Sequence, residues 1–155
     1  MNSRQKGRMG HTYTETYLQE QGWSTYTCPH ATLQWEGGTG GWNDAYAAPN
    51  PETGKVEGGF DIIAVKPFIE YTVIGPFKSY EDRSKKEESR TVSHLEASLW
   101  QVKKTKANPF TPKFKREIRR CVEFYNLVPS TCFGIWWPNG HGPKGKPPII
   151  WRSDE

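Results

Sequence analysis

The stretch Leu99-Trp100-Gln101-Val102-Lys103 predicts a β-strand with Trp100 and Val102 on one face. Because successive side chains in a strand point to opposite faces, Gln101 and Lys103 then project together from the other face. A second predicted strand begins within residues 58–65, and it opens with an acid, Asp61. If an antiparallel return makes the two strands neighbours, the three side chains form a polar cluster on an apolar sheet. Such a cluster is suited to holding a divalent cation against a phosphate.

The chain has 155 residues, which predicts a single domain over residues 1–155. It contains seven each of Trp, Tyr and Phe, and these bulky side chains make an ordered core feasible. No apolar run approaches the ~20 residues that span a bilayer, and the polar, basic N-terminus does not resemble a secretory signal. The three cysteines are odd in number and widely spaced. We therefore expect an intracellular, cytoplasmic protein without a membrane partner.

Positive charge is concentrated in one segment. Residues 103–120 contain eight bases and one acid, Glu117, although the whole chain has a net charge of only +4. A basic stripe beside a candidate phosphate site suggests that the partner is a nucleic-acid backbone, and the alternative is a solvated helix face. The candidate nucleic-acid-binding residues are Lys104, Lys106, Lys113, Arg116, Arg119 and Arg120.

The order of the predicted elements indicates an α/β domain with a mixed central sheet flanked by helices. A hydroxyl cap followed by proline, Thr111-Pro112, predicts the start of an amphipathic helix. The other predicted elements are a helix over residues 10–21 and strands over residues 23–28, 60–74, 92–105, 130–137 and 149–151.

Three segments are predicted to be irregular. Residues 1–9 suggest a flexible basic arm, and the charged residues 78–90 suggest the solvated tip of a long hairpin. Residues 29–57 are rich in glycine and proline and suggest a flexible loop. Long loops are often functional, so this one either closes over a ligand or is a disordered excursion.

The order of short motifs resembles the PD-(D/E)xK nuclease superfamily. The motifs are Leu18-x-x-x-Gly22-Trp23, Gly59-Phe60-Asp61-Ile62-Ile63 and Gln101-x-Lys103. Within this superfamily, the chain is most similar to the archaeal-type Holliday junction resolvases, over roughly residues 7–151. That resemblance implies a restriction-endonuclease-like core and a Mg²⁺-dependent endonuclease, with Mn²⁺ as a substitute. It also implies a homodimer that hydrolyses phosphodiester bonds at four-way DNA junctions, and the small size would suit a phage or archaeal source.

The resemblance has three departures. The usual Glu-x-Lys is Gln101-x-Lys103 here, and an amide oxygen can bind a hard cation but adds no negative charge. Where resolvases place a glutamate on the first helix, this chain has His11, with Glu15 one turn later on the same face. The hairpin between Asp61 and Gln101 is longer than in the compact resolvases, which suits dimerisation or substrate fit.

The resemblance implies that Asp61 and Gln101 bind the metal and that Lys103 assists the attack on the phosphate. His11 and Glu15 compete for a further catalytic position. Each of these residues has a plainer alternative. Asp61 could be a hydrogen-bonded turn acid, Gln101 an ordinary residue of the sheet face and Lys103 a surface lysine. His11 and Glu15 could belong to a plain surface helix. Glu96 is a reserve ligand that would need a bulge to reach the site.

Other functions remain open at this point. The same fold could serve a restriction, repair or single-strand nuclease, or a non-catalytic DNA-binding protein in which Gln101 marks a decayed site. Cys28-Pro29-His30 could begin a zinc site, although no second pair has fitting spacing. No phosphate-binding glycine loop, dinucleotide fingerprint or nucleophile elbow is present.

Overall fold

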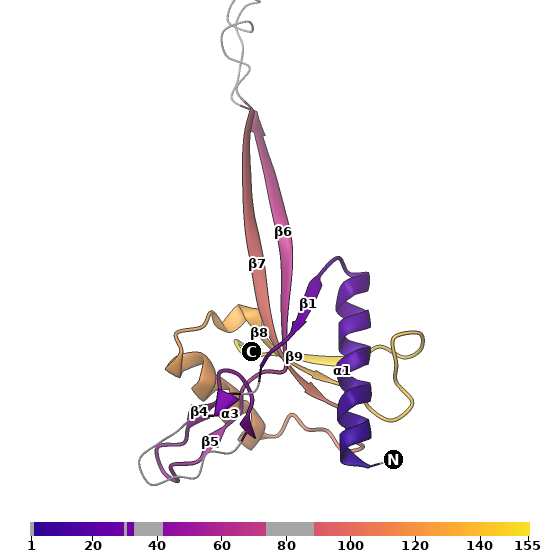
Figure 1. The fold of residues 1–155 in the computed structure, drawn as a ribbon, viewed down its shortest axis with the longest axis vertical. Coiled ribbons are helices and arrows are strands. Elements are labelled where there is room, and N and C mark those ends of the chain that lie inside the picture. Colours follow the sequence, from indigo (N-terminus) through magenta and orange to yellow (C-terminus); the bar gives the residue numbers. More distant parts are fainter. Residues whose placement is uncertain (1, 30, 33–41, 74–88) are drawn as a thin grey trace, which may run out of the picture.

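The computed structural model describes residues 2–29, 31–32, 42–73 and 89–155. Within these residues, a five-stranded mixed sheet lies between helix α1 (Ser3–Glu20) and helix α3 (Pro112–Phe124) (Figure 1). The predicted α/β class with a mixed central sheet is therefore confirmed. The sheet has the order β1-β6-β7-β8-β9, in which only β7 and β8 are parallel. Its strands are β1 (Ser24–Thr27), β6 (Ile62–Val73), β7 (Ser89–Lys103), β8 (Cys132–Trp136) and β9 (Ile149–Arg152).

The sheet separates two apolar cores, and strand alternation assigns each residue to one of them. Trp100 packs with Leu18 and Ile135 on the α1 face, whereas Leu99 packs with Ile118 on the α3 face. Gln101 follows Leu99 by two positions, so its side chain belongs to the α3 face of the sheet. The predicted two faces of this strand are therefore confirmed.

Strands β6 and β7 form one long antiparallel hairpin, from Ile62 opposite Trp100 to Val73 opposite Ser89. Only one end of this hairpin pairs with β1 and β8, so the remainder projects from the body as a two-stranded arm (Figure 1). The predicted hairpin is confirmed. Its predicted charged tip, residues 78–90, lies outside the described residues except for its last two, which belong to β7.

Helix α1 begins earlier than the sequence analysis predicts. Asn2 caps it, because the Asn2 side chain accepts a hydrogen bond from the Gln5 main chain and the Gln5 side chain accepts one in return. The prediction of a flexible arm was therefore wrong for residues 3–9. Gly10 sits where the helix crosses β7, and a Cβ atom there would lie 3.2 Å from Val102 Cγ1. The absence of a side chain thus lets α1 approach the strand that carries Gln101 and Lys103.

The segment after β1 is not a structureless loop where it is described. Two small antiparallel pairs form within it, and the chain then returns to the main sheet through Phe60. The prediction of one flexible loop over residues 29–57 was wrong in this respect, because short antiparallel main-chain pairs order the described parts of the segment. Residues 30 and 33–41 lie outside the described part. The short strands are β2 (Ala31–Thr32), β3 (Trp42–Asn43), β4 (Ala48–Pro49) and β5 (Val56–Glu57).

Helix α3 anchors the β4–β5 segment. Tyr125, which follows the helix, donates a hydrogen bond from its hydroxyl to the Ala47 carbonyl at 2.8 Å. Arg120 forms an ion pair with Glu57 at 3.5 Å. The predicted start of α3 is confirmed, since the Thr111 side chain accepts a hydrogen bond from the Phe114 main chain. A short 3-10 turn, η1 (Pro129–Thr131), then leads into β8. Among the described residues, no helix is both long and apolar enough to cross a bilayer.

Candidate functional site

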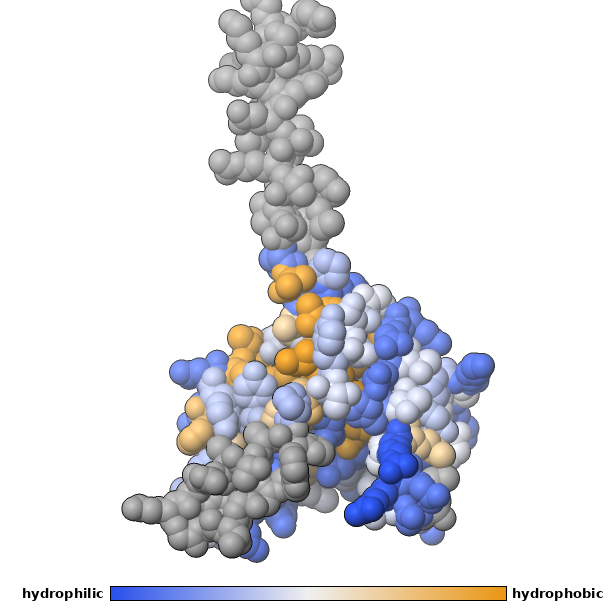
Figure 2. Space-filling view, viewed as in Figure 1, coloured by the Kyte–Doolittle hydropathy of each residue, from blue (hydrophilic) through white to orange (hydrophobic). Residues whose placement is uncertain are grey.

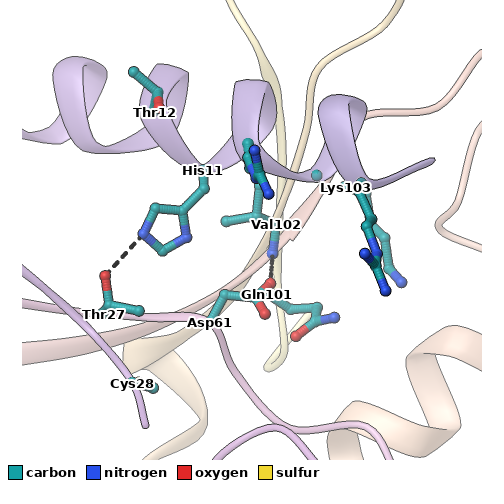
Figure 3. A pocket seen from close by; sticks show the side chains of 11 residues that line it. His11, Thr12, Thr27, Cys28, Asp61, Gln101, Val102 and Lys103 are labelled. Atoms are coloured by element: carbon teal, nitrogen blue, oxygen red, sulfur yellow. Dashed lines mark hydrogen bonds between the residues drawn. The ribbon is translucent and has the colours of Figure 1, made fainter. Parts of the chain in front are cut away.

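Asp61 lies directly before β6, opposite the end of β7 that carries Gln101. Its main-chain N–H donates to the Trp100 carbonyl at 2.8 Å, and its Oδ2 accepts a hydrogen bond from the Val102 N–H at 2.8 Å. The sequence alone does not give the register between the strand that follows Asp61 and the strand that carries Gln101. The β6–β7 hairpin sets this register. It brings Asp61 and Gln101 side by side beneath α1 (Figure 3).

These residues line a pocket of about 770 Å³ that α1 residues also line. Both Asp61 and Gln101 reach it, as does Lys103 from the last position of β7. The predicted grouping of these three side chains is confirmed. The lining also includes Arg4, Gly7, Arg8, His11, Thr12, Thr27, Cys28 and Val102.

The pKa of Asp61 is raised from 3.8 to about 7. Burial contributes most, because it disfavours the charged carboxylate, and the negative charge of Asp44 contributes next. The Val102 N–H and the Lys103 ammonium oppose this shift. A side-chain hydrogen bond between Asp44 and Asp61 raises the pKa further, since it favours a proton on Asp61. Such a strongly shifted acid in a pocket is typical of a functional site.

Gln101 lines the same pocket and carries a buried side-chain oxygen. Its side chain is only 7% exposed, and its Oε1 has no hydrogen-bond partner within the described part of the chain. A buried carbonyl oxygen without a donor typically costs about 1–3 kcal/mol, so structures rarely keep one without a reason. A cation is a natural partner for an oxygen that accepts from no donor.

Lys103 supplies positive charge at the pocket wall. Its Nζ lies 5.9 Å from the centre of the Phe114 ring, and its charge lowers the pKa of Asp61. The apolar ring holds the side chain on the α3 face while the ammonium stays beside the acid. Lys103 is therefore close enough to Asp61 to influence its ionisation.

Of the two rival residues on α1, His11 lines the pocket, whereas Glu15 is not among the residues that line it. The His11 Nε2 lies 2.7 Å from Glu15 Oε1 and 3.0 Å from Thr27 Oγ1. Figure 3 shows the imidazole ring between the helix and Thr27. Glu15 therefore contacts His11, and of the two only His11 lines the pocket.

The predicted nucleic-acid-binding residues differ in their surroundings, because some contact other protein groups and others are exposed. Arg120 is engaged with Glu57, and Arg119 donates to the Glu155 carbonyl while its guanidinium lies 5.5 Å from the Trp151 ring centre. Lys104 lies over the ring of Tyr13. Lys113, Arg116 and Lys106 are exposed.

Two weaker expectations also have an outcome. Glu96 is exposed and pairs in register with Lys66 on the projecting arm, so it does not join the pocket. Cys28 does line the pocket, but burial raises the pKa of its thiol to about 11, with Asp61 and Asp44 adding to the shift. His30, the other half of the suggested zinc pair, lies outside the described residues.

Sequence reasoning missed three residues of this region, which are Arg4, Arg8 and Asp44. Arg4 and Arg8 are one helical turn apart and line the pocket with His11. The spacing of these three residues at positions i, i+4 and i+7 was a usable signal, hidden by the assumption that residues 1–9 are unstructured. Figure 2 shows strongly hydrophilic residues over this end of α1. No sequence pattern indicated that Asp44 belongs to this region, because only the folding of the chain back through Phe60 brings Asp44 to Asp61.

The donor set fits a hard divalent cation. Within the residues that the structure describes, no three His, Cys, Asp or Glu side chains gather as a metal cluster. The oxygen donors are instead the Asp61 carboxylate and the orphaned Gln101 Oε1, which the hairpin places next to each other. Carboxylate and amide oxygens are the ligands that Mg²⁺ and Mn²⁺ accept.

Comparison of the chain with profiles of known protein families, with curated proteins and with solved structures found no match.

Proposed function

We propose that the protein is a metal-dependent DNA endonuclease of the PD-(D/E)xK type, with a restriction-endonuclease-like core, that hydrolyses phosphodiester bonds at four-way junctions. The observation that carries this proposal is the pocket in which Asp61, the orphaned Gln101 oxygen and Lys103 meet. The order of the motifs along the chain supports it, because it resembles that of the archaeal-type resolvases. Three cationic side chains on the walls, from Arg4, Arg8 and Lys103, suit an anionic backbone.

Asp61 and Gln101 would hold Mg²⁺ or Mn²⁺ through their side-chain oxygens. When bound, the cation supplies a water of lowered pKa and neutralises charge that develops on the phosphate. Lys103 directs its ammonium toward the same region and stabilises the negative charge of the transition state. Arg4 and Arg8 bind flanking phosphates and hold the strand over the pocket.

In this proposal, Glu15 orients the ring of His11. The Glu15 carboxylate lies 2.7 Å from Nε2, so an Nε2–H can donate to it and leave the electron pair of Nδ1 free toward the pocket wall. This arrangement suits a group that accepts a proton or a hydrogen bond at the pocket wall. His11 would thus replace the acid that resolvases carry on this helix.

The test is a comparison of labelled substrates. The wild-type protein is incubated with a four-way junction, a matching duplex and a single strand, in Mg²⁺ and in chelator, beside Asp61→Asn and the control Asp154→Asn. We expect paired nicks in the junction, in Mg²⁺ only, that Asp61→Asn abolishes and Asp154→Asn retains. Equal cleavage of all three substrates would contradict the specificity for junctions and would indicate a nuclease of another substrate class. Binding of DNA without any cleavage would instead indicate a non-catalytic DNA-binding protein.

A homodimer is part of the same proposal. Two-fold symmetry in the protein would match the two-fold symmetry of a junction and place one pocket on each of two strands. Light scattering after size exclusion should give about twice the mass of the chain, which is 17.8 kDa. A monomer that nicks both strands independently would contradict this part.

A further inference from the structure

The proposed site contains one acid from the main sheet, Asp61, because position 101 is an amide. A second carboxylate, from a different part of the chain, contacts Asp61. Asp44 follows β3, and its side chain hydrogen bonds to Asp61. Two carboxyl groups in contact repel each other once both are charged, and such pairs are stable only when a proton or a cation lies between them.

Main-chain contacts hold Asp44 in this position. The neighbouring Ala45 forms an isolated bridge with Phe60, whose N–H donates to the Ala45 carbonyl at 2.9 Å. The Ala47 N–H donates to the Asp44 carbonyl at 3.2 Å. Gly59 packs so closely that an added Cβ would lie 2.7 Å from Asp44 Cβ. Asp44 is therefore placed by the same turn that places Asp61.

A separate observation indicates that a ligand belongs here. Gln101 is only 7% exposed and lines the same pocket as Asp61, and its Oε1 has no hydrogen-bond partner among the described residues. A proton shared by the two acids would leave that oxygen unsatisfied. A divalent cation satisfies the amide oxygen and both carboxylates together.

We propose that Asp44 is a ligand of the cation at the proposed nuclease site, together with Asp61 and Gln101. Asp44 supplies the negative charge that position 101 lacks. Two carboxylates and one amide give the site the same charge as a site with an acid at Asp61 and at position 101. The inference rests on the proposed function, since it names a further ligand of the same cation.

Direct measurement of Mn²⁺ binding separates this inference from the function itself. The full chain is titrated with Mn²⁺ at pH 7.5, and free Mn²⁺ is followed by electron paramagnetic resonance. The variants are Asp44→Asn, Asp61→Asn and the double variant Asp44→Asn with Gln101→Glu, with Asp154→Asn as the matched control. Asp154 pairs with Arg152 near the C-terminus and does not line the pocket.

We expect Asp44→Asn to weaken Mn²⁺ binding at least tenfold, and the added Gln101→Glu to restore most of the affinity. The control should bind as the wild type does. Binding by Asp44→Asn within twofold of the wild type, while Asp61→Asn loses it, would overturn the role of Asp44 and leave the proposed function standing. No binding by the wild type would overturn both. A loss that Gln101→Glu does not restore would assign Asp44 to the structure of the turn and overturn its role as a ligand.

Thermal unfolding in chelator provides a second readout. Without a cation, the two carboxyl groups repel each other, so Asp44→Asn should unfold at the same temperature as the wild type or higher. Its stabilisation by Mn²⁺ should be smaller than that of the wild type. A lower unfolding temperature in chelator, or failure of the variant to fold, would show that Asp44 serves the fold and would overturn the inference.

Discussion

Asp61 is the residue on which the site depends, and its environment does not favour its charge. Burial and the Asp44 charge raise its pKa to about 7, and the Val102 N–H and Lys103 only partly compensate. The sequence could identify Asp61, because an acid that enters an apolar strand needs a partner. The sequence could not identify Asp44 as that partner, since no local pattern links the two positions.

The raised pKa predicts how stability depends on pH in the metal-free protein. An acid whose folded pKa is about 7 and whose unfolded pKa is about 3.9 binds its proton more tightly when folded. The stabilisation of the folded state that this tighter proton binding provides is fully present below pH 4 and is lost as the pH rises to 7. Between pH 5 and 8 the wild type should lose about 1–3 kcal/mol of unfolding free energy relative to Asp61→Asn. Urea unfolding in chelator checks this, and parallel pH profiles of the two proteins would contradict it.

Gln101 gives a second prediction at this scale. Gln101→Glu adds a negative charge where the structure has an orphaned oxygen. Without metal, a further buried acid should destabilise the fold, whereas Mn²⁺ should stabilise the variant more than it stabilises the wild type. The quantity to measure is the difference in unfolding temperature between Mn²⁺ and chelator. Gln21→Glu, at the exposed end of α1, is the control and should leave that difference unchanged. A smaller difference in Gln101→Glu would show that the oxygen faces no cation.

At the scale of elements, the sequence predicted the parts that local rules determine. The Thr111 cap and the apolar stripe of α3 are local, and so are the strand alternation around Gln101 and the long hairpin. The start of α1 was missed because the Asn2–Gln5 capping box was read as part of a loose basic arm. The turn from β3 to β6 was missed because it depends on pairing with residues distant in sequence, such as Ala45 with Phe60.

Gly59 tests whether that turn positions the acids. Its φ is +96°, and an added Cβ would lie 2.7 Å from Asp44 Cβ and 2.8 Å from the Ala45 carbonyl oxygen. Gly54 is the matched control, because its φ is +73° but nothing lies within 4 Å of an added Cβ. Both alanine variants pay the conformational cost of about 1–2 kcal/mol, and Gly59→Ala should lose about 1–3 kcal/mol more through the clash. Equal losses in chemical denaturation would mean that the packing of Gly59 on Asp44 is unimportant.

At the scale of the whole molecule, the pocket lies where α1 crosses the sheet near the end of the hairpin that pairs with β1 and β8. Its basic wall comes from two elements distant in sequence, α1 and β7. The sequence analysis located positive charge on residues 103–120, where Arg119 and Arg120 have structural partners. The structure adds Arg4 and Arg8, on the helix across the sheet from α3, to the lining of the pocket.

The two arginines of α1 should carry part of the salt-dependent binding. A double Arg4→Gln and Arg8→Gln variant should bind a four-way junction about tenfold more weakly. The slope of log affinity against log salt should fall by about 2, since each lost phosphate contact contributes about 0.9. The comparison is Lys113→Gln with Arg116→Gln on exposed α3 positions, measured by fluorescence anisotropy over a range of salt. If only the α3 pair changes the slope, the backbone follows α3 and not α1.

Single-turnover cleavage of a labelled four-way junction by Lys103→Met, in Mg²⁺, tests most directly whether this pocket performs the hydrolysis. The control is Lys55→Met, an exposed lysine that neither lines the pocket nor belongs to the candidate nucleic-acid-binding residues. The account predicts that Lys103→Met binds the junction within about threefold of the wild type but cleaves it at least ~100-fold more slowly, while Lys55→Met cleaves at the wild-type rate. Cleavage by Lys103→Met at the wild-type rate would contradict the account.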